Sequence, residues 1–123
     1  MSAPPLIAVI DDDESIRVSL EGLVRSLGYK VCSFAAAEAY LRAEARAASD
    51  CVISDVQMPG GMDGIELIET LAASGDTTPV ILITAFADAH IKARAEKAGA
   101  AGFLKKPFDG GKLIDCLHTA LRL

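Results

Sequence analysis

Short strand-like runs alternate with helical patterns along the whole chain, and this alternation limits the possible folds more than any other feature. The runs rich in aliphatic and β-branched residues are Leu6–Ile10, Lys30–Phe34, Cys51–Ser54, Val80–Thr84 and Gly102–Leu104. Strand–helix–strand units with short connections make right-handed crossovers, and the parallel sheet that results must be covered on both faces. We therefore predict an α/β fold, a doubly wound five-stranded parallel sheet with five helices.

The five helical patterns have apolar residues at three- or four-residue spacing, but one of them is much weaker than the others. Strong patterns surround Leu20, Leu41, Ile68 and Leu117. The pattern between Asp88 and Ala98 has only Ile91, Ala95 and Ala98 as apolar positions, interleaved with charged residues. We expect this segment to be the least firmly anchored helix.

Length and composition favour one folded domain that spans residues 1–123 and needs no disulfide bonds. The net charge of -5 argues against direct nucleic-acid binding by this domain, because phosphate contacts need clustered Lys and Arg. No apolar run is long enough to span a membrane, and Met1–Pro5 does not resemble a targeting leader. Three cysteines without a paired spacing suggest reduced thiols, so the expected location is the cytoplasm.

Four acidic residues, Asp11–Glu14, follow the first strand-like run directly. Like charges this close repel by about 1 kcal/mol per pair even in water, so a compensating charge is needed. A divalent cation is one candidate, and the amino terminus of the following helix is another. Asp11 and Asp13 also match the Asp-x-Asp nucleophile motif of haloacid-dehalogenase-like phosphatases, and this segment alone leaves the three interpretations open.

Further polar residues follow the other strands, where ligands bind in doubly wound sheets. Asp55 follows the third strand-like run, Thr84 ends the fourth, and Lys106 comes soon after the fifth. A carboxylate can accept a phosphoryl group when nearby cations neutralise the combined negative charge. Two groups would supply that positive charge: a Mg²⁺ ion held by one or two carboxylates, and a lysine side chain. A threonine hydroxyl can bind a phosphoryl oxygen.

In chain order, Asp11-Asp12, Asp55-x-x-Met58-Pro59, Thr84-Ala85 and Lys106-Pro107-Phe108 resemble the receiver domains of response regulators in two-component phosphorelays. The resemblance covers residues 6–121 and implies a flavodoxin-like sheet with strand order 2-1-3-4-5. The roles that it implies are these: Asp55 as phosphoacceptor; Asp11, Asp12, Asp55 and the backbone carbonyl of Gln57 as ligands of Mg²⁺ or, as a substitute, Mn²⁺; Lys106 as phosphate contact; Thr84 as switch hydroxyl; and Phe103 as aromatic switch.

The resemblance also implies a function, which is to take a phosphoryl group from a sensor histidine kinase or a histidine phosphotransfer protein. The domain would catalyse no reaction besides its own phosphorylation and dephosphorylation. Its output surface would be the face formed by the helix at 88–98, the fifth strand and the last helix, with homodimerisation on phosphorylation as a further possibility. Ile83–Phe86 and Gly102–Phe108 most resemble FixJ-like transcriptional receivers, which is compatible with a longer regulator or with a single-domain one.

One departure from the family pattern is an apparent extra residue in the loop Met58–Gly64.

Two alternatives to phosphorylation of Asp55 remain. A phosphatase that uses Asp11 would need a later acidic pair, but after Lys106 only Asp109 and Asp115 follow, far apart. A receiver-like module that works through protein contacts alone would not need the intact set of acids, hydroxyl and lysine. We expect Asp13 and Asp63 to cap helices and Lys105 to be solvated.

Overall fold

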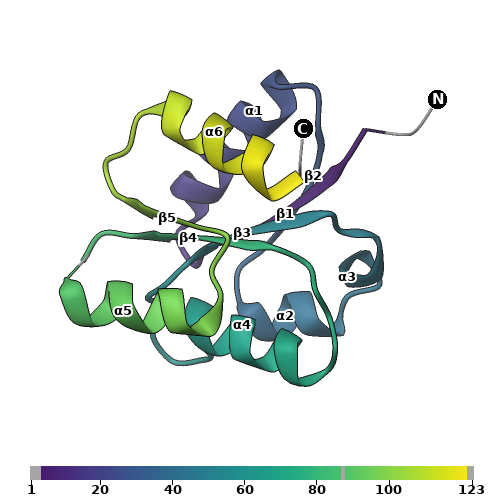
Figure 1. Ribbon diagram of the computed structural model, residues 1–123. Helices are drawn as coiled ribbons and strands as arrows, with labels where there is room; N and C mark the ends of the chain where they lie inside the picture. Colours follow the sequence, from purple (N-terminus) through teal and green to yellow (C-terminus); the bar gives the residue numbers. More distant parts are fainter. Residues whose placement is uncertain (1–3, 87, 122–123) are drawn as a thin grey trace.

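A five-stranded parallel sheet lies between two layers of helices (Figure 1). The computed structural model describes residues 4–86 and 88–121; the ends of the predicted domain at residues 1–3 and 122–123 lie outside this range. The strands are β1 (Leu6–Ile10), β2 (Lys30–Phe34), β3 (Cys51–Asp55), β4 (Val80–Thr84) and β5 (Gly102–Lys105). Their order is β2-β1-β3-β4-β5, which confirms the predicted doubly wound α/β fold with strand order 2-1-3-4-5.

The described residues form six helices, and they cover the two faces of the sheet separately. Their bounds are α1 (Glu14–Ser26), α2 (Ala37–Arg42), α3 (Ala45–Ala48), α4 (Gly64–Ala73), α5 (Ala89–Ala98) and α6 (Gly110–Leu121). Helices α1 and α6 lie on one face, and α2, α4 and α5 lie on the other (Figure 1). Each strand must therefore be apolar on both sides, which explains the continuous aliphatic runs in the sequence.

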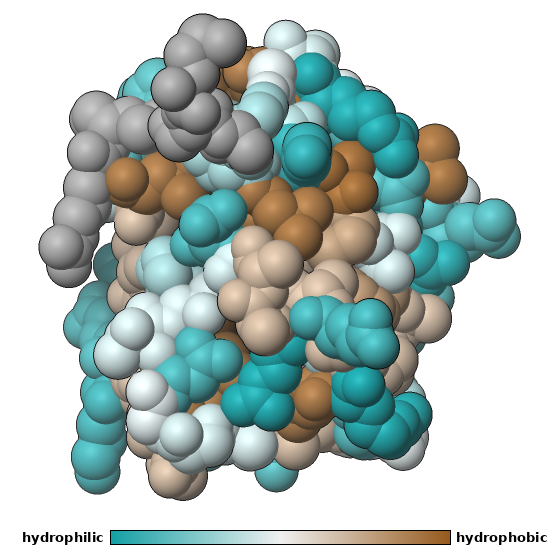
Figure 2. Space-filling model, turned by 90° about the vertical axis from the view of Figure 1, so that its right-hand side faces the viewer, coloured by the Kyte–Doolittle hydropathy of each residue, from teal (hydrophilic) through white to brown (hydrophobic). Residues whose placement is uncertain are grey.

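Alternate residues of each strand serve two separate cores. On β1, Ile7 and Val9 belong to the cluster under α1 and α6, whereas Ala8 and Ile10 belong to the cluster under α2, α4 and α5. The edge strand β2 is less covered, because it has a neighbour on one side only. Figure 2 views the side that carries this edge, where hydrophobic residues gather in the middle and upper part of the face among hydrophilic ones.

The prediction of five helices was wrong by one, because the expected second helix is divided. The backbone at Ala43 is extended, with φ -82° and ψ 145°, so α2 ends at Arg42 and a single turn, α3, follows. The guanidinium of Arg46 donates to the carbonyl oxygen of Leu41 at 3.4 Å, and the hydroxyls of Tyr40 and Ser49 share a hydrogen bond of 2.6 Å. These contacts stabilise a break that the helical periodicity does not reveal.

Three helices begin with the same aspartate cap. The side chains of Asp13, Asp63 and Asp88 accept hydrogen bonds from the amide three residues later, at 3.1, 2.7 and 2.8 Å. At Asp63 the side chain of Glu66 also accepts from the backbone amide of Asp63, which completes a capping box. The capping roles predicted for Asp13 and Asp63 are thus confirmed.

Helix α5 is weakly anchored, as its sequence indicated. Of its ten residues only Ala95 is buried, whereas α4, of equal length, buries five.

Among residues 4–86 and 88–121, no helix combines the length and the apolarity that crossing a membrane requires.

Gly64 fits α4 against the end of β3, and its replacement tests how tightly the two are packed. A Cβ at this position would lie 2.5 Å from the carbonyl oxygen of Asp55 and 2.8 Å from Cδ2 of Leu82. We expect Gly64→Ala to lower the free energy of unfolding by about 2 kcal/mol, measured by urea denaturation, because the added methyl group overpacks this contact.

Gly22 provides the matched control, because it lies in α1 and a Cβ there would meet no atom within 4 Å. We expect Gly22→Ala to raise the free energy of unfolding by about 0.5–1 kcal/mol, since alanine is the better helix former. Equal effects of the two substitutions would contradict the close packing at Gly64.

Candidate functional site

Three carboxylates meet at the carboxyl ends of β1 and β3. Asp11 and Asp12 follow β1, and Asp55 is the last residue of the neighbouring β3. One oxygen from each of the three lies within 4.8 Å of the others. Asp11 and Asp55 are buried, with 1% and 9% of their surface exposed, whereas Asp12 is exposed. The cluster predicted from the sequence therefore forms, with one side open to solvent.

The ammonium group of Lys106 lies between the two buried carboxylates. Its Nζ is 2.9 Å from Oδ2 of Asp55 and 3.3 Å from Oδ2 of Asp11. The side chain of Lys106 is 18% exposed, whereas the neighbouring Lys105 points to solvent as predicted. The Lys106–Pro107 peptide bond is cis. One positive charge thus offsets part of the negative charge that the strand ends bring together.

The pKa values of these groups depend on their burial and on one another. Burial raises the pKa of Asp11, and the charge of Asp55 adds to this, while the amide of Asp13 and the ammonium of Lys106 act in the opposite direction. Burial alone would lower the pKa of Lys106, but its hydrogen bond to Asp55 and the charges of Asp55 and Asp11 outweigh this and raise it. Lys106 is therefore a permanent cation at neutral pH.

Backbone contacts fix the orientation of Asp11. Its Oδ1 accepts a hydrogen bond from the amide of Asp13 at 2.9 Å. Its carbonyl oxygen accepts from Nη1 of Arg17, a residue of the first turn of α1, at 2.7 Å. The sequence analysis did not identify Arg17, because a basic residue near the start of a helix gives no sign of a contact back to the loop that precedes the helix.

Thr84 and Gln57 form a contact that the sequence analysis also missed. The hydroxyl of the buried Thr84 lies 2.5 Å from Oε1 of Gln57 and accepts from the amide of Phe86 at 3.0 Å. The amide of Gln57 donates to Oδ1 of Asp55 at 3.0 Å. Gln57 therefore touches Asp55 with its backbone and Thr84 with its side chain. The resemblance had assigned Gln57 a backbone role only, as a ligand of Mg²⁺.

Phe103 does not join the acid cluster. It is partly buried on β5 and packs against the core under α2, α4 and α5. It pairs with Leu82 on β4, and Thr84 lies two residues further along that strand, so Thr84 and Phe103 face the same side of the sheet. This is also the side on which α5 lies. Phe86 is 72% exposed beside the site.

The loop between β3 and α4 is attached to α2 by Glu38. Oε2 of Glu38 accepts from the amide of Met62 at 3.0 Å, and this hydrogen bond lowers the pKa of the Glu38 carboxyl. Gly60 has φ 87°, a backbone conformation that favours glycine, and a Cβ at Gly61 would lie 2.8 Å from Oε2 of Glu38. Glu38 thus holds the loop in which the sequence indicated an extra residue.

The residues present fit a hard divalent cation such as Mg²⁺. Carboxylate oxygens are the protein ligands that Mg²⁺ prefers, and it keeps several waters, so an open side at the exposed Asp12 suits it. The net charge of three carboxylates and one ammonium also favours a cation. That the backbone carbonyl of Gln57 is a further ligand stays a prediction.

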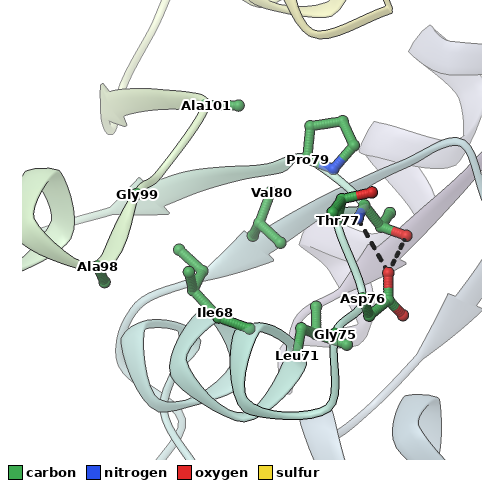
Figure 3. Close-up of a pocket in the computed structure, with 12 residues that line it drawn as sticks. Ile68, Leu71, Gly75, Asp76, Thr77, Pro79, Val80, Ala98, Gly99 and Ala101 are labelled. Atoms are coloured by element: carbon green, nitrogen blue, oxygen red, sulfur yellow. Dashed lines mark hydrogen bonds between the residues drawn. The ribbon is translucent and has the colours of Figure 1, made fainter.

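One cavity at the other end of the strands differs from the acid cluster in its chemistry. A cavity of about 410 Å³ lies at the amino ends of β4 and β5, at the opposite edge of the sheet from the acid cluster (Figure 3). Its lining is mostly aliphatic, and its one ionisable residue, Asp76, accepts hydrogen bonds from the amide and hydroxyl of Thr78 at 2.9 and 2.6 Å. Asp76 also pairs with Nε of Arg46 at 3.4 Å, so its contacts are structural.

Comparisons with known proteins agree with this geometry. Residues 7–118 match the response regulator receiver domain family. The chain is 40% identical to the transcriptional regulatory protein FixJ of Bradyrhizobium diazoefficiens over 94% of its own length and 56% of FixJ. The chain spans about half the length of the curated relatives it matches.

Two solved structures are similar in sequence and in fold. The response regulator StyR superposes with a TM-score of 0.88 at 42% identity, over 98% of this chain and 60% of StyR. The chemotaxis protein CheY4 of Vibrio cholerae superposes with a TM-score of 0.84 at 30% identity, over 97% of this chain and 100% of CheY4. Both similarities extend over almost all of the chain.

Substitution of the exposed Asp12 separates a cation site from a helix-capping role. We expect Asp12→Asn to weaken Mg²⁺ binding about tenfold, because one carboxylate ligand and one negative charge are lost. We also expect the free protein to melt at a slightly higher temperature, since repulsion in the cluster falls. Isothermal titration with Mg²⁺ and thermal melts check the two effects.

Asp13→Asn is the matched control, because Asp13 caps α1 and asparagine is an equally good cap. Its affinity for Mg²⁺ should remain within about twofold of the unmodified protein, because its charge lies outside the cluster. A Mg²⁺ affinity unchanged by Asp12→Asn would show that Asp12 is no ligand.

Proposed function

The chain belongs to the response regulator receiver domains of two-component systems, and on that premise we propose that it accepts a phosphoryl group on Asp55. The observation that carries the proposal is the position of Asp55, whose carboxylate contacts the ammonium of Lys106 and lies beside two further carboxylates. A nucleophilic carboxylate next to a fixed cation and a cation-binding cluster has what phosphoryl transfer requires.

In the proposed reaction, a carboxylate oxygen of Asp55 attacks the phosphorus of a partner's phosphohistidine. The new O–P bond forms as the P–N bond breaks, and the imidazole nitrogen keeps the electron pair of that bond. Lys106 stabilises the negative charge on the phosphoryl oxygens. Asp11, Asp12, Asp55 and the carbonyl of Gln57 would hold Mg²⁺, which supplies charge neutralisation for the phosphoryl oxygens when bound.

Phosphorylation would then shift an existing equilibrium between two conformations. In our proposal the hydroxyl of Thr84 moves to a phosphoryl oxygen, Phe103 turns inward, and the weakly anchored α5 rearranges. These parts lie on one side of the sheet, and α5 has few buried contacts to lose. The output surface would accordingly be formed by α5, β5 and α6.

The family implies a phosphodonor partner and an output. We propose a sensor histidine kinase or a histidine phosphotransfer protein as the donor, and a transcriptional output, because FixJ is named a transcriptional regulatory protein. Homodimerisation on phosphorylation, a cytoplasmic location and the lack of any activity beyond self-phosphorylation and dephosphorylation belong to the same proposal.

The alternative in which Asp11 is a phosphatase nucleophile is not favoured. A phosphatase of that kind would need a later acidic pair, and after Lys106 the sequence offers only Asp109 and Asp115, far apart. Family membership also disfavours it. Holding like charges together in a buried place is unfavourable. A module that works without phosphorylation does not explain why Asp11, Asp55 and Lys106 are clustered there.

Intact-mass measurement after treatment with a small acyl phosphate and Mg²⁺ tests the nucleophile. We expect a gain of one phosphoryl group that disappears in Asp55→Asn, because an amide cannot accept it. Asp115→Asn is the control, since Asp115 is an exposed aspartate on α6. Absence of the mass gain in the unmodified protein would contradict the proposal.

Removal of the Lys106 charge should separate phosphorylation from the switch. We expect Lys106→Ala to accept the phosphoryl group still, but to lose the changes in amide chemical shifts that phosphorylation causes in residues 84–106. The reason is that the lysine contacts the phosphoryl group after transfer. Lys105→Ala, the exposed neighbour, should retain the full response. Loss of the response in both variants, or in neither, would refute this role.

A further inference from the structure

Gln57 connects the proposed phosphoacceptor with the proposed switch residue. Its backbone amide donates to Oδ1 of Asp55 at 3.0 Å, and its side-chain Oε1 lies 2.5 Å from the hydroxyl of Thr84. Thr84 is fully buried, so its hydroxyl cannot turn to water instead. A single residue thus determines hydrogen bonds at both groups that must change when Asp55 is phosphorylated.

The direction of the Thr84 hydrogen bond follows from its second contact. The amide of Phe86 donates to Oγ1 of Thr84 at 3.0 Å, which occupies a lone pair of the hydroxyl. The hydroxyl proton remains, and the carbonyl oxygen of the Gln57 side chain accepts it. The hydroxyl has only one proton, so it cannot donate to Gln57 and to a phosphoryl oxygen at the same time.

We propose that the side-chain carbonyl of Gln57 is a latch that holds the Thr84 hydroxyl in the resting conformation. In this proposal phosphorylation of Asp55 releases the latch by offering the same proton an anionic acceptor. The inference rests on the proposed function, in which Thr84 supplies the switch hydroxyl, and it adds a positioning role for a side chain that the resemblance assigned only a backbone role.

The energetics of this exchange set the sensitivity of the switch. A hydrogen bond to a neutral carbonyl contributes less than one to a charged oxygen, so the exchange is favourable only after phosphorylation. Before phosphorylation the Gln57 contact keeps the switched conformation rare. Loss of this contact should raise the population of the switched conformation, and with it the affinity for a phosphoryl group, by about fivefold.

Gln57→Met tests the latch with little change in side-chain size, because methionine has a similar length and no carbonyl oxygen. The probe is beryllofluoride, a phosphoryl mimic, added with Mg²⁺, and its affinity is measured for the unmodified protein, Gln57→Met, Thr84→Ala and the double variant. We expect Gln57→Met to bind the mimic about fivefold more tightly. In the Thr84→Ala background the same substitution should change nothing, since there is no hydroxyl to hold.

This cycle distinguishes a latch from a direct contact between residue 57 and the mimic. Equal tightening with and without the Thr84 hydroxyl would overturn the proposal, and so would no tightening in either background. Binding of Mg²⁺ alone is measured for each variant, so that a change at the cation site is not mistaken for a change in the switch. If the unmodified protein does not bind the mimic, the proposed function fails, and the latch is judged by the next measurement.

Hydrogen exchange in the unphosphorylated protein tests the latch directly. The Phe86 amide reports on Thr84, because it donates to the same hydroxyl. We expect its exchange to be about fivefold faster in Gln57→Met, whereas Gln57→Glu, which keeps an acceptor oxygen, should exchange like the unmodified protein. Exchange at Phe86 that is equal in Gln57→Met and the unmodified protein would overturn the proposal. The amides of the distant β2 serve as the control for global stability.

Discussion

The contact between Lys106 and the two buried aspartates is the interaction on which the rest of the site depends. A parallel sheet brings the carboxyl ends of its strands to one edge, and in this chain β1 and β3 both deliver carboxylates there. Two such charges in a partly buried place repel strongly unless a cation lies nearby. Lys106, from the end of β5, extends to both at 2.9 and 3.3 Å, so one charge compensates residues that are 51 and 95 positions away.

Lys106 neutralises only part of the negative charge, and the negative charge that remains gives the site its chemistry. Three carboxylates face one ammonium group, and Asp12 leaves one side of the cluster exposed. The cluster therefore suits a divalent cation. The charges of that cation and of the Lys106 ammonium would then favour an incoming phosphoryl group. A fully neutralised cluster would be more stable, but it would not attract a divalent cation or a phosphoryl group. The apolar cores on both sides of the sheet hold the groups in place despite this repulsion.

Sequence reasoning predicted the fold class and the acid cluster, because these depend on short-range patterns and on the geometry of parallel sheets. The strand order was implied by the resemblance to receiver domains. Sequence reasoning did not reveal that α2 and α3 are separate, since Arg46 and Ser49 stabilise the break through contacts with Leu41 and Tyr40 of α2. Nor did it identify Arg17, Glu38 or the side chain of Gln57 as parts of the site. Each of these makes a hydrogen bond to a partner that its own sequence pattern does not indicate.

The sequence by itself determined which chemical groups the edge of the sheet carries: the carboxylates, a hydroxyl and an amine at the ends of successive strands. It did so because strand periodicity and chain direction decide which residues reach that edge. Only the tertiary structure decided how those groups pair. Lys106 joins Asp55 and Asp11, while Thr84 points to Gln57 rather than to the acid cluster. The physical reason is that a shift of a few tenths of an ångström between separate strands and loops decides which groups form a hydrogen bond. Their relative positions are set by packing of the whole domain.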